Sequence, residues 1–92
     1  MTPTHFTVTL TFYDPTDAST KWQKLTYTMS FRVPVVRGQS SDADVRGTKL
    51  TAVSWAGSAL RTGFDWPKTS TTTVIILPNH IVSAVVTEEV SG

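Results

Sequence analysis

The clearest pattern in this chain lies near its start, in residues 5–13, which read HFTVTLTFY. Apolar side chains occupy every second position from Phe6 to Phe12, and threonines stand between them. Because successive side chains of a β-strand point to opposite faces of a sheet, this alternation predicts a strand with one buried face and one exposed face. The Asp14-Pro15 pair that follows indicates a turn, since aspartate can bond its own backbone and proline fixes φ.

A second alternating stretch runs from Lys24 to Val33, with apolar side chains at the odd positions. Shorter apolar or alternating stretches follow at residues 48–55, 71–77 and 81–86, which gives five expected strands. The tight Pro78-Asn79-His80 turn between the last two predicts that they pair as a hairpin.

The composition supports a fold built mainly of strands. The 92 residues include 17 Thr and 11 Val but only two Glu and two Gln, and branched side chains suit a pleated sheet better than a helix. We expect an all-β chain that forms a single domain over residues 1–92, a small five-stranded barrel or sandwich of the SH3 or Sm type. No helix longer than about two turns is predicted. Residues 38–47 are expected to be a mobile loop and residues 87–92 a polar tail.

Several classes of function find no support in the residues. The chain has no cysteine, which excludes a disulfide scaffold and a thiol nucleophile. The histidines, His5 and His80, are far apart and lack a nucleophile motif beside them. Residues 42–53 begin like a calcium loop but place Arg46 and Val53 where ligands belong. We therefore expect no enzyme activity, no catalytic residues, no metal and no cofactor. No signal peptide or membrane helix is recognisable, so a cytoplasmic protein is expected.

The charge distribution is less even than the formal net charge of +1. All eight basic residues lie between Lys21 and Lys68, with three acids among them, so this stretch carries +5. A basic surface can follow a phosphate backbone, although outward positions on strands also need charged side chains. Binding of RNA or single-stranded DNA by a small Sm-like or OB-like barrel is therefore the alternative function.

The tryptophans all fall within this basic stretch. Trp22 has the parity of Lys24, opposite the apolar face of the second strand, and Trp66 lies in an expected loop beside Phe64. Exposed aromatic rings beside cations can contact proteins or stack on bases, whereas inward rings would close the core. The candidate partner-binding residues share this aromatic or basic character; they are Trp22, Lys24, Arg32, Arg61, Phe64 and Trp66.

The C-terminal stretch NHIVSAVV, residues 79–86, resembles the second motif of the Sm-like proteins, and residues 47–50, GTKL, are faintly similar to their first motif. The resemblance covers about a third of the chain, and Asn79 stands where the family has a basic residue. It implies a small barrel whose last strands join one subunit to the next. The overall style is that of small phage or high-GC bacterial proteins.

With no catalytic constellation in view, the favoured function is a non-enzymatic domain that binds another protein, as a phage or accessory protein would bind a host or sister protein. The contacts are expected from exposed strand edges and the aromatic loop. A chain this small leaves strand edges open, and an open edge is a template for another chain, so a homo-oligomer is expected as well.

Overall fold

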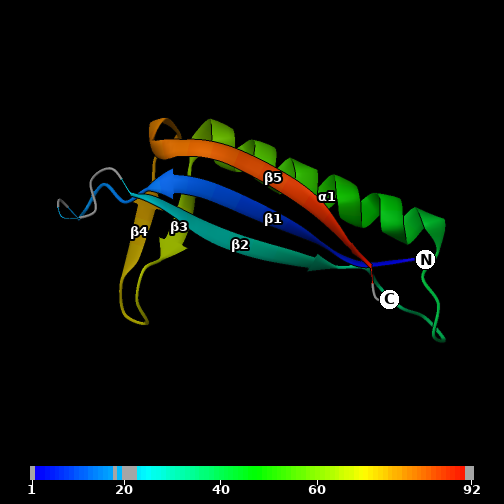
Figure 1. Cartoon of the computed structure of the whole chain (residues 1–92). Helices are drawn as coiled ribbons and strands as arrows, with labels where there is room; N and C mark the ends of the chain where they lie inside the picture. Colours follow the sequence, from blue (N-terminus) through cyan, green and yellow to red (C-terminus); the bar gives the residue numbers. More distant parts are fainter. Residues whose placement is uncertain (1, 18, 20–22, 91–92) are drawn as a thin grey trace.

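The computed structural model describes residues 2–17, 19 and 23–90 of the chain (Figure 1). One long helix and two small antiparallel sheets make up the molecule, which measures 49 × 25 × 22 Å. The elements in chain order are β1 (Pro3–Tyr13), β2 (Lys24–Arg32), α1 (Asp42–Thr62), β3 (Phe64–Pro67), β4 (Thr73–Ile76), the short 3₁₀ helix η2 (Pro78–His80) and β5 (Ile81–Val90).

The central strand of the larger sheet is β1, where the alternating sequence predicted a strand with one buried face. It pairs antiparallel with β2 on one side and β5 on the other, in the order β2-β1-β5. Val8 lies opposite Met29 in β2 and Val86 in β5. The apolar side chains of β1 are almost fully buried, from Phe6 to Phe12, while the threonines lie on the other face, which we call the far face.

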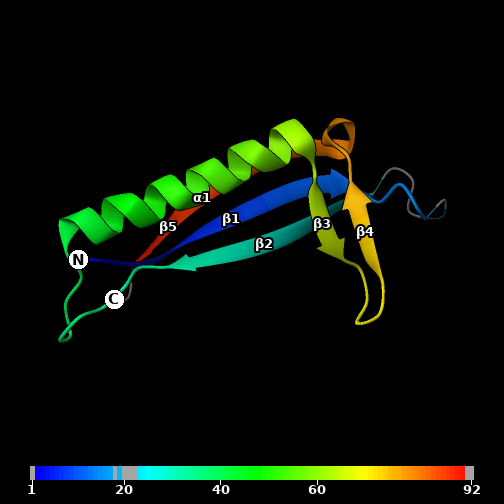
Figure 2. The ribbon, with the colours of Figure 1, turned by 180° about the vertical axis from the view of Figure 1, so that it is seen from behind.

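The helix α1 covers the buried face of this sheet along its length (Figure 2). Its N-terminus is capped by the Ser41 side chain, which accepts a hydrogen bond from the Asp44 backbone N–H. Ala52, Ala56 and Ala59 are its buried residues, and their small side chains let the helix approach the strands closely. Trp55 packs on Phe31, the last residue but one of β2, with ring centroids 6.1 Å apart.

The second sheet is the β3–β4 hairpin, which lies against one end of the larger sheet and extends past β2 (Figures 1 and 2). Phe64 and Trp66 meet Phe12 edge-on, at centroid distances of 5.2 and 5.0 Å. Phe64 also stacks on Tyr27 at 5.7 Å. These rings close that end of the core, together with Ile76 of β4, which is fully buried.

The prediction of a chain rich in strands is confirmed, but no barrel closes. Residues 42–62 form a helix of 21 residues, so the expected strand at 48–55 and the limit of two helical turns are both wrong. The helix also takes up residues 42–47 of the expected mobile loop. The buried side of the helix consists of three alanines at helical spacing. The β-branched residues around them hide this spacing in the sequence.

The expected pairing of the last two strands is also wrong. β4 pairs with β3, while β5 belongs to the other sheet and pairs with β1. Residues 64–67, expected as a loop, form β3, and Thr87–Val90 of the expected polar tail continue β5. Within the described residues, no helix is long and apolar enough to cross a membrane.

Candidate interaction surfaces

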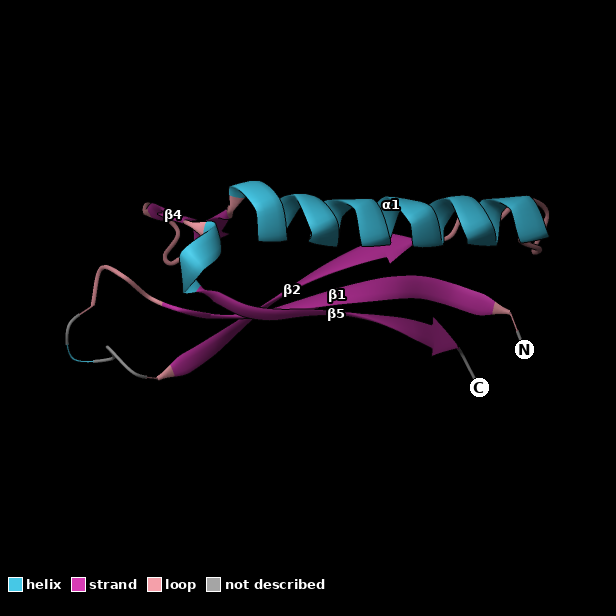
Figure 3. Ribbon diagram, turned by 90° about the horizontal axis from the view of Figure 1, so that it is seen from above, coloured by secondary structure: helices cyan, strands magenta, loops and turns pink. Residues whose placement is uncertain are grey.

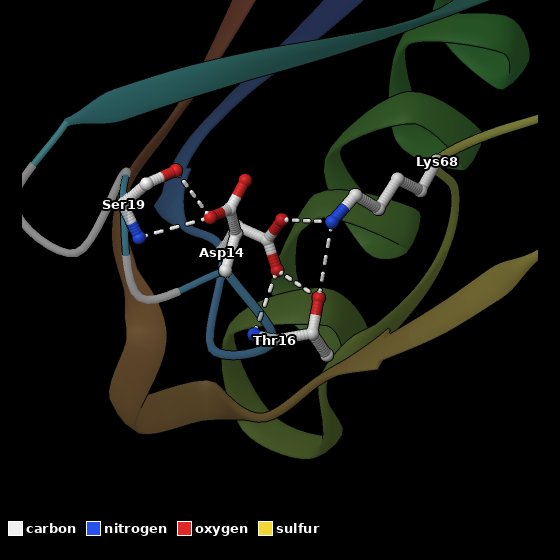
Figure 4. Close-up of polar contacts among 5 residues, drawn as sticks. Asp14, Thr16, Ser19 and Lys68 are labelled. Carbon is white, nitrogen blue, oxygen red and sulfur yellow. Dashed lines mark hydrogen bonds and ion pairs between the residues drawn. The ribbon is translucent and has the colours of Figure 1, made fainter.

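Asp14, at the end of β1, is the one buried charged side chain of the described residues, with 4% of its surface exposed. Its carboxylate accepts hydrogen bonds from the Thr16 backbone N–H at 2.8 Å and the Thr16 hydroxyl at 2.6 Å. Lys68, from the tip of the β3–β4 hairpin, reaches the other carboxylate oxygen at 2.9 Å (Figure 4). The cluster ties the hairpin to the turn after β1.

Burial alone would raise the pKa of Asp14, because it removes water from the carboxylate. The hydrogen bonds from Thr16 and Lys68, with the Lys68 charge, outweigh burial and bring the pKa below its ordinary 3.8. The same contact raises the pKa of Lys68. An ionised acid that is fully engaged in this way holds structure together; it is not poised to exchange a proton.

The histidines do not assemble a catalytic site in the described part of the chain. Nδ1 of His5 lies 3.0 Å from the Thr4 hydroxyl, and Nδ1 of His80 is buried without a hydrogen-bond partner there. The described residues likewise contain no group of three potential metal ligands. The candidate sites that remain among the described residues are surface features, namely the sheet edges and the grooves beside α1.

The basic candidate residues lie on different surfaces. Lys24 and Arg32 stand at opposite ends of β2 on the far face, eight residues or about 26 Å apart. Arg32 lies opposite His5 of β1, and His5 lies opposite Glu89 of β5. The acid Glu89 is therefore in the same cross-strand row as Arg32. Arg61 is on the last turn of α1, on the other side of the sheet. These three candidates therefore do not share one face of the described structure.

The described aromatic candidates are Phe64 and Trp66, both on β3. Phe64 is 7% exposed and belongs to the core, so its side chain cannot serve as a partner contact in this fold. Trp66 is half-buried against Phe12. Trp22 lies outside the described residues. The aromatic loop expected from the sequence is thus a strand whose rings face inward.

Two shallow grooves run between β2 and α1. One is lined by Phe31, Arg32 and Pro34 on the sheet side and by Thr48 and Thr51 on the helix. The other lies between Met29 of β2, Trp55 and Ser58 of α1, and the start of β3. These grooves show which flank of α1 faces β2, and helical periodicity then places the residues of the opposite flank on the β5 side.

The outer edge of β5 is one of the exposed strand edges expected from the sequence, although no residue of β5 was among the candidate contacts. β5 is the last strand of its sheet, and Figure 3 looks onto this edge with no other strand or helix in front of most of its length. Its ladder with β1 is regular from Ser83 to Glu89; a bulge interrupts it before Ser83. Val82 and Val85 are 46% and 52% exposed. The available signal was the run of residues 81–87, which contains no charge and no proline.

The chain matches no protein-family model, no curated protein and no solved structure. The Sm-like resemblance therefore stays a prediction.

Proposed function

We propose that this chain is a non-enzymatic protein-binding domain, and that its partner adds a strand along the outer edge of β5. The observation that carries the proposal is the unprotected state of this edge. Edge strands of monomeric proteins are usually shortened, charged or interrupted by proline, because their free backbone groups attract other chains. β5 is ten residues long, and residues 83–87 of its regular ladder read SAVVT.

The other edge of the sheet is better protected. β2 begins with Lys24 and ends with Arg32, and Pro34 follows two residues later. The β3–β4 hairpin also crosses one end of β2 (Figure 2). The contrast between the two edges favours β5 as the place where a partner docks.

Strand addition suits the chemistry of β5. Main-chain hydrogen bonds supply most of the affinity in this mode of recognition, and alternate side chains supply specificity. The half-buried Ala84 and Val86 face α1, and the exposed Val85 is on the far face beside Thr9. A contact of this kind depends little on salt, unlike binding to phosphates.

The test compares protein capture from a host lysate by three forms of the chain: wild type, Val85→Lys and Thr28→Lys. Both positions are exposed and lie near the middle of an edge strand, so Thr28→Lys is the matched control on β2. We expect the tagged chain to capture a specific protein, which can be an untagged copy of the chain expressed in the same nuclease-treated lysate, and we expect Val85→Lys to lose this protein and Thr28→Lys to retain it. Capture that disappears with nuclease, or equal loss in both variants, would contradict the proposal.

A further inference from the structure

Resting on the proposed function, we infer that the strand added to β5 is the β5 of a second copy of this chain. The two strands run antiparallel about a two-fold axis at Val85 and join the sheets into one of six strands. The order across this sheet is β2-β1-β5 in one protomer, continued by β5-β1-β2 in its partner.

The pleat restricts the register of such a pair. Ala84 and Val86 lie opposite Leu10 and Val8 and therefore share the helix-covered face, while Ser83, Val85 and Thr87 lie on the far face. Side chains directly opposite each other in a sheet must be on the same face. Val85 opposite its own copy meets this condition, because Ala84 then lies opposite Val86 and Ser83 opposite Thr87.

Charge separates the two edges as sites of self-association. In the Val85-centred register, Glu88 and Glu89 lie beyond the partner's Ser83, beside the bulged start of its β5, where no acid stands, so no like charges meet. The equivalent pair of β2 strands, centred on Thr28, places Lys24 opposite Arg32 at both ends. Like charges directly opposite each other destabilise a sheet. The second copy therefore fits β5 and is disfavoured at β2.

A mixed contact between β5 of one copy and β2 of the next is also less favourable. With both helices on the same face of the sheet, that arrangement pairs the strands in parallel, which is slightly less stable per residue. Antiparallel pairing of β5 with β2 puts the two helices on opposite faces. Only the two-fold contact gives antiparallel strands, helices on one side and a closed assembly.

The helix layer fits the same symmetry. α1 lies over β1 and β5 and runs antiparallel to β5. With strands about 4.8 Å apart, a helix over the line between β1 and β5 lies about 10 Å from its two-fold copy, near the usual spacing of packed helices.

The flank of α1 on the β5 side, opposite the grooves next to β2, carries apolar side chains that are only partly covered in the described chain. Val53, near the middle of the helix, and Leu60 are each 46% exposed. Leu60 lies near the level of the proposed axis, because Ser58 and Ala59 line a groove with Met29, whose row of the sheet contains Val8 and Val86. The second copy would cover Leu60, Ala84 and Val86 in one contact.

The absence of cysteine makes the test direct. Directly opposite residues of antiparallel strands have Cα atoms about 4.5–5.5 Å apart, which is within the range that a disulfide spans. Under mild oxidation, Val85→Cys is expected to form a covalent dimer nearly completely, and Thr28→Cys is expected to stay monomeric on a non-reducing gel. A Thr28→Cys dimer, or no Val85→Cys dimer, would overturn the inference.

Light scattering on the purified chain provides the second readout. Wild type and Thr28→Lys should show twice the chain mass of 10.1 kDa, and Val85→Lys should show the single mass, with unchanged circular dichroism. A wild-type mass of one chain, or one that grows without limit, overturns the two-fold dimer. A monomer that still loses a captured protein through Val85→Lys would contradict this inference alone and leave the proposed function standing.

Discussion

Replacing Gly63 by alanine should destabilise the fold more than a glycine-to-alanine change at any other described glycine. Gly63 ends α1 with φ 88° and ψ −176°, a backbone region that is open to glycine and costs other residues about 1–3 kcal/mol. A Cβ there would also overlap the Ile76 carbonyl oxygen of β4. Displacing a packed segment costs about 1–3 kcal/mol more.

We therefore expect Gly63→Ala to lower the free energy of unfolding by about 3 kcal/mol, after allowing about 0.4–1 kcal/mol for the lower entropy of the unfolded chain. For a domain of this size, that corresponds to a fall in Tm of about 12–24 °C, measured by circular dichroism on heating.

The matched control is Gly47→Ala, inside α1, where an added Cβ meets nothing within 4 Å. Because alanine favours a helix over glycine by about 0.5–1 kcal/mol, this variant should be more stable than wild type. A Gly63→Ala protein as stable as wild type would refute the observed turn from α1 into β3. A destabilised Gly47→Ala would refute the helix itself.

Three further outcomes follow from the described contacts. Leu10→Ala, at a fully buried position of β1, should cost about 2–5 kcal/mol in urea denaturation; a change below about 0.5 kcal/mol would mean that Leu10 is not in the core. Asp14→Asn should be less stable than wild type near neutral pH. Folding lowers the pKa of Asp14, so its ionised carboxylate contributes fully to the free energy of unfolding above about pH 4 to 5. This contribution disappears as the pH falls through the lowered pKa, so the unfolding free energies of wild type and Asp14→Asn should converge in acid. A difference that stays constant with pH would contradict the ion pair. Trypsin should cut first after Arg37, which is exposed in a turn with φ 53°, and should spare Arg46 within α1; early cleavage at Arg46, detected by mass spectrometry, would contradict the helix.

The sequence predicted the strands best where the alternation of apolar and polar side chains is the dominant pattern. The alternation in β1 and β2 is long and regular, so both strands and their buried faces were predicted correctly. The helix was missed because its interior contains Thr48, Thr51 and Val53, residues that prefer strands, and because its buried side consists of alanines. Contact with the sheet outweighs these local preferences.

The pairing of the last strands could not be predicted from their separation along the chain. η2 turns the chain out of the hairpin sheet, and β5 then crosses to the free side of β1. The same long-range contact determines which surfaces are open. Composition alone could place Phe64 and Trp66 outside or inside, and in the structure they meet Phe12 in the core. The edge of β5 is exposed because no other strand of the described chain pairs with it.

Amide hydrogen exchange along β5 tests the central claim most directly, because it reports on the backbone groups that a partner strand would bind. In a lone chain, alternate amides of residues 83–89 point to solvent and exchange fast, whereas those bonded to β1 are protected. We predict that, in the wild-type protein, the outward amides of β5 are protected as well and lose this protection in Val85→Lys, while the outward amides of β2 exchange fast in both. Fast exchange at the outward β5 amides of the wild type, at the highest protein concentration that stays in solution, would contradict pairing of β5 with a second copy of the chain.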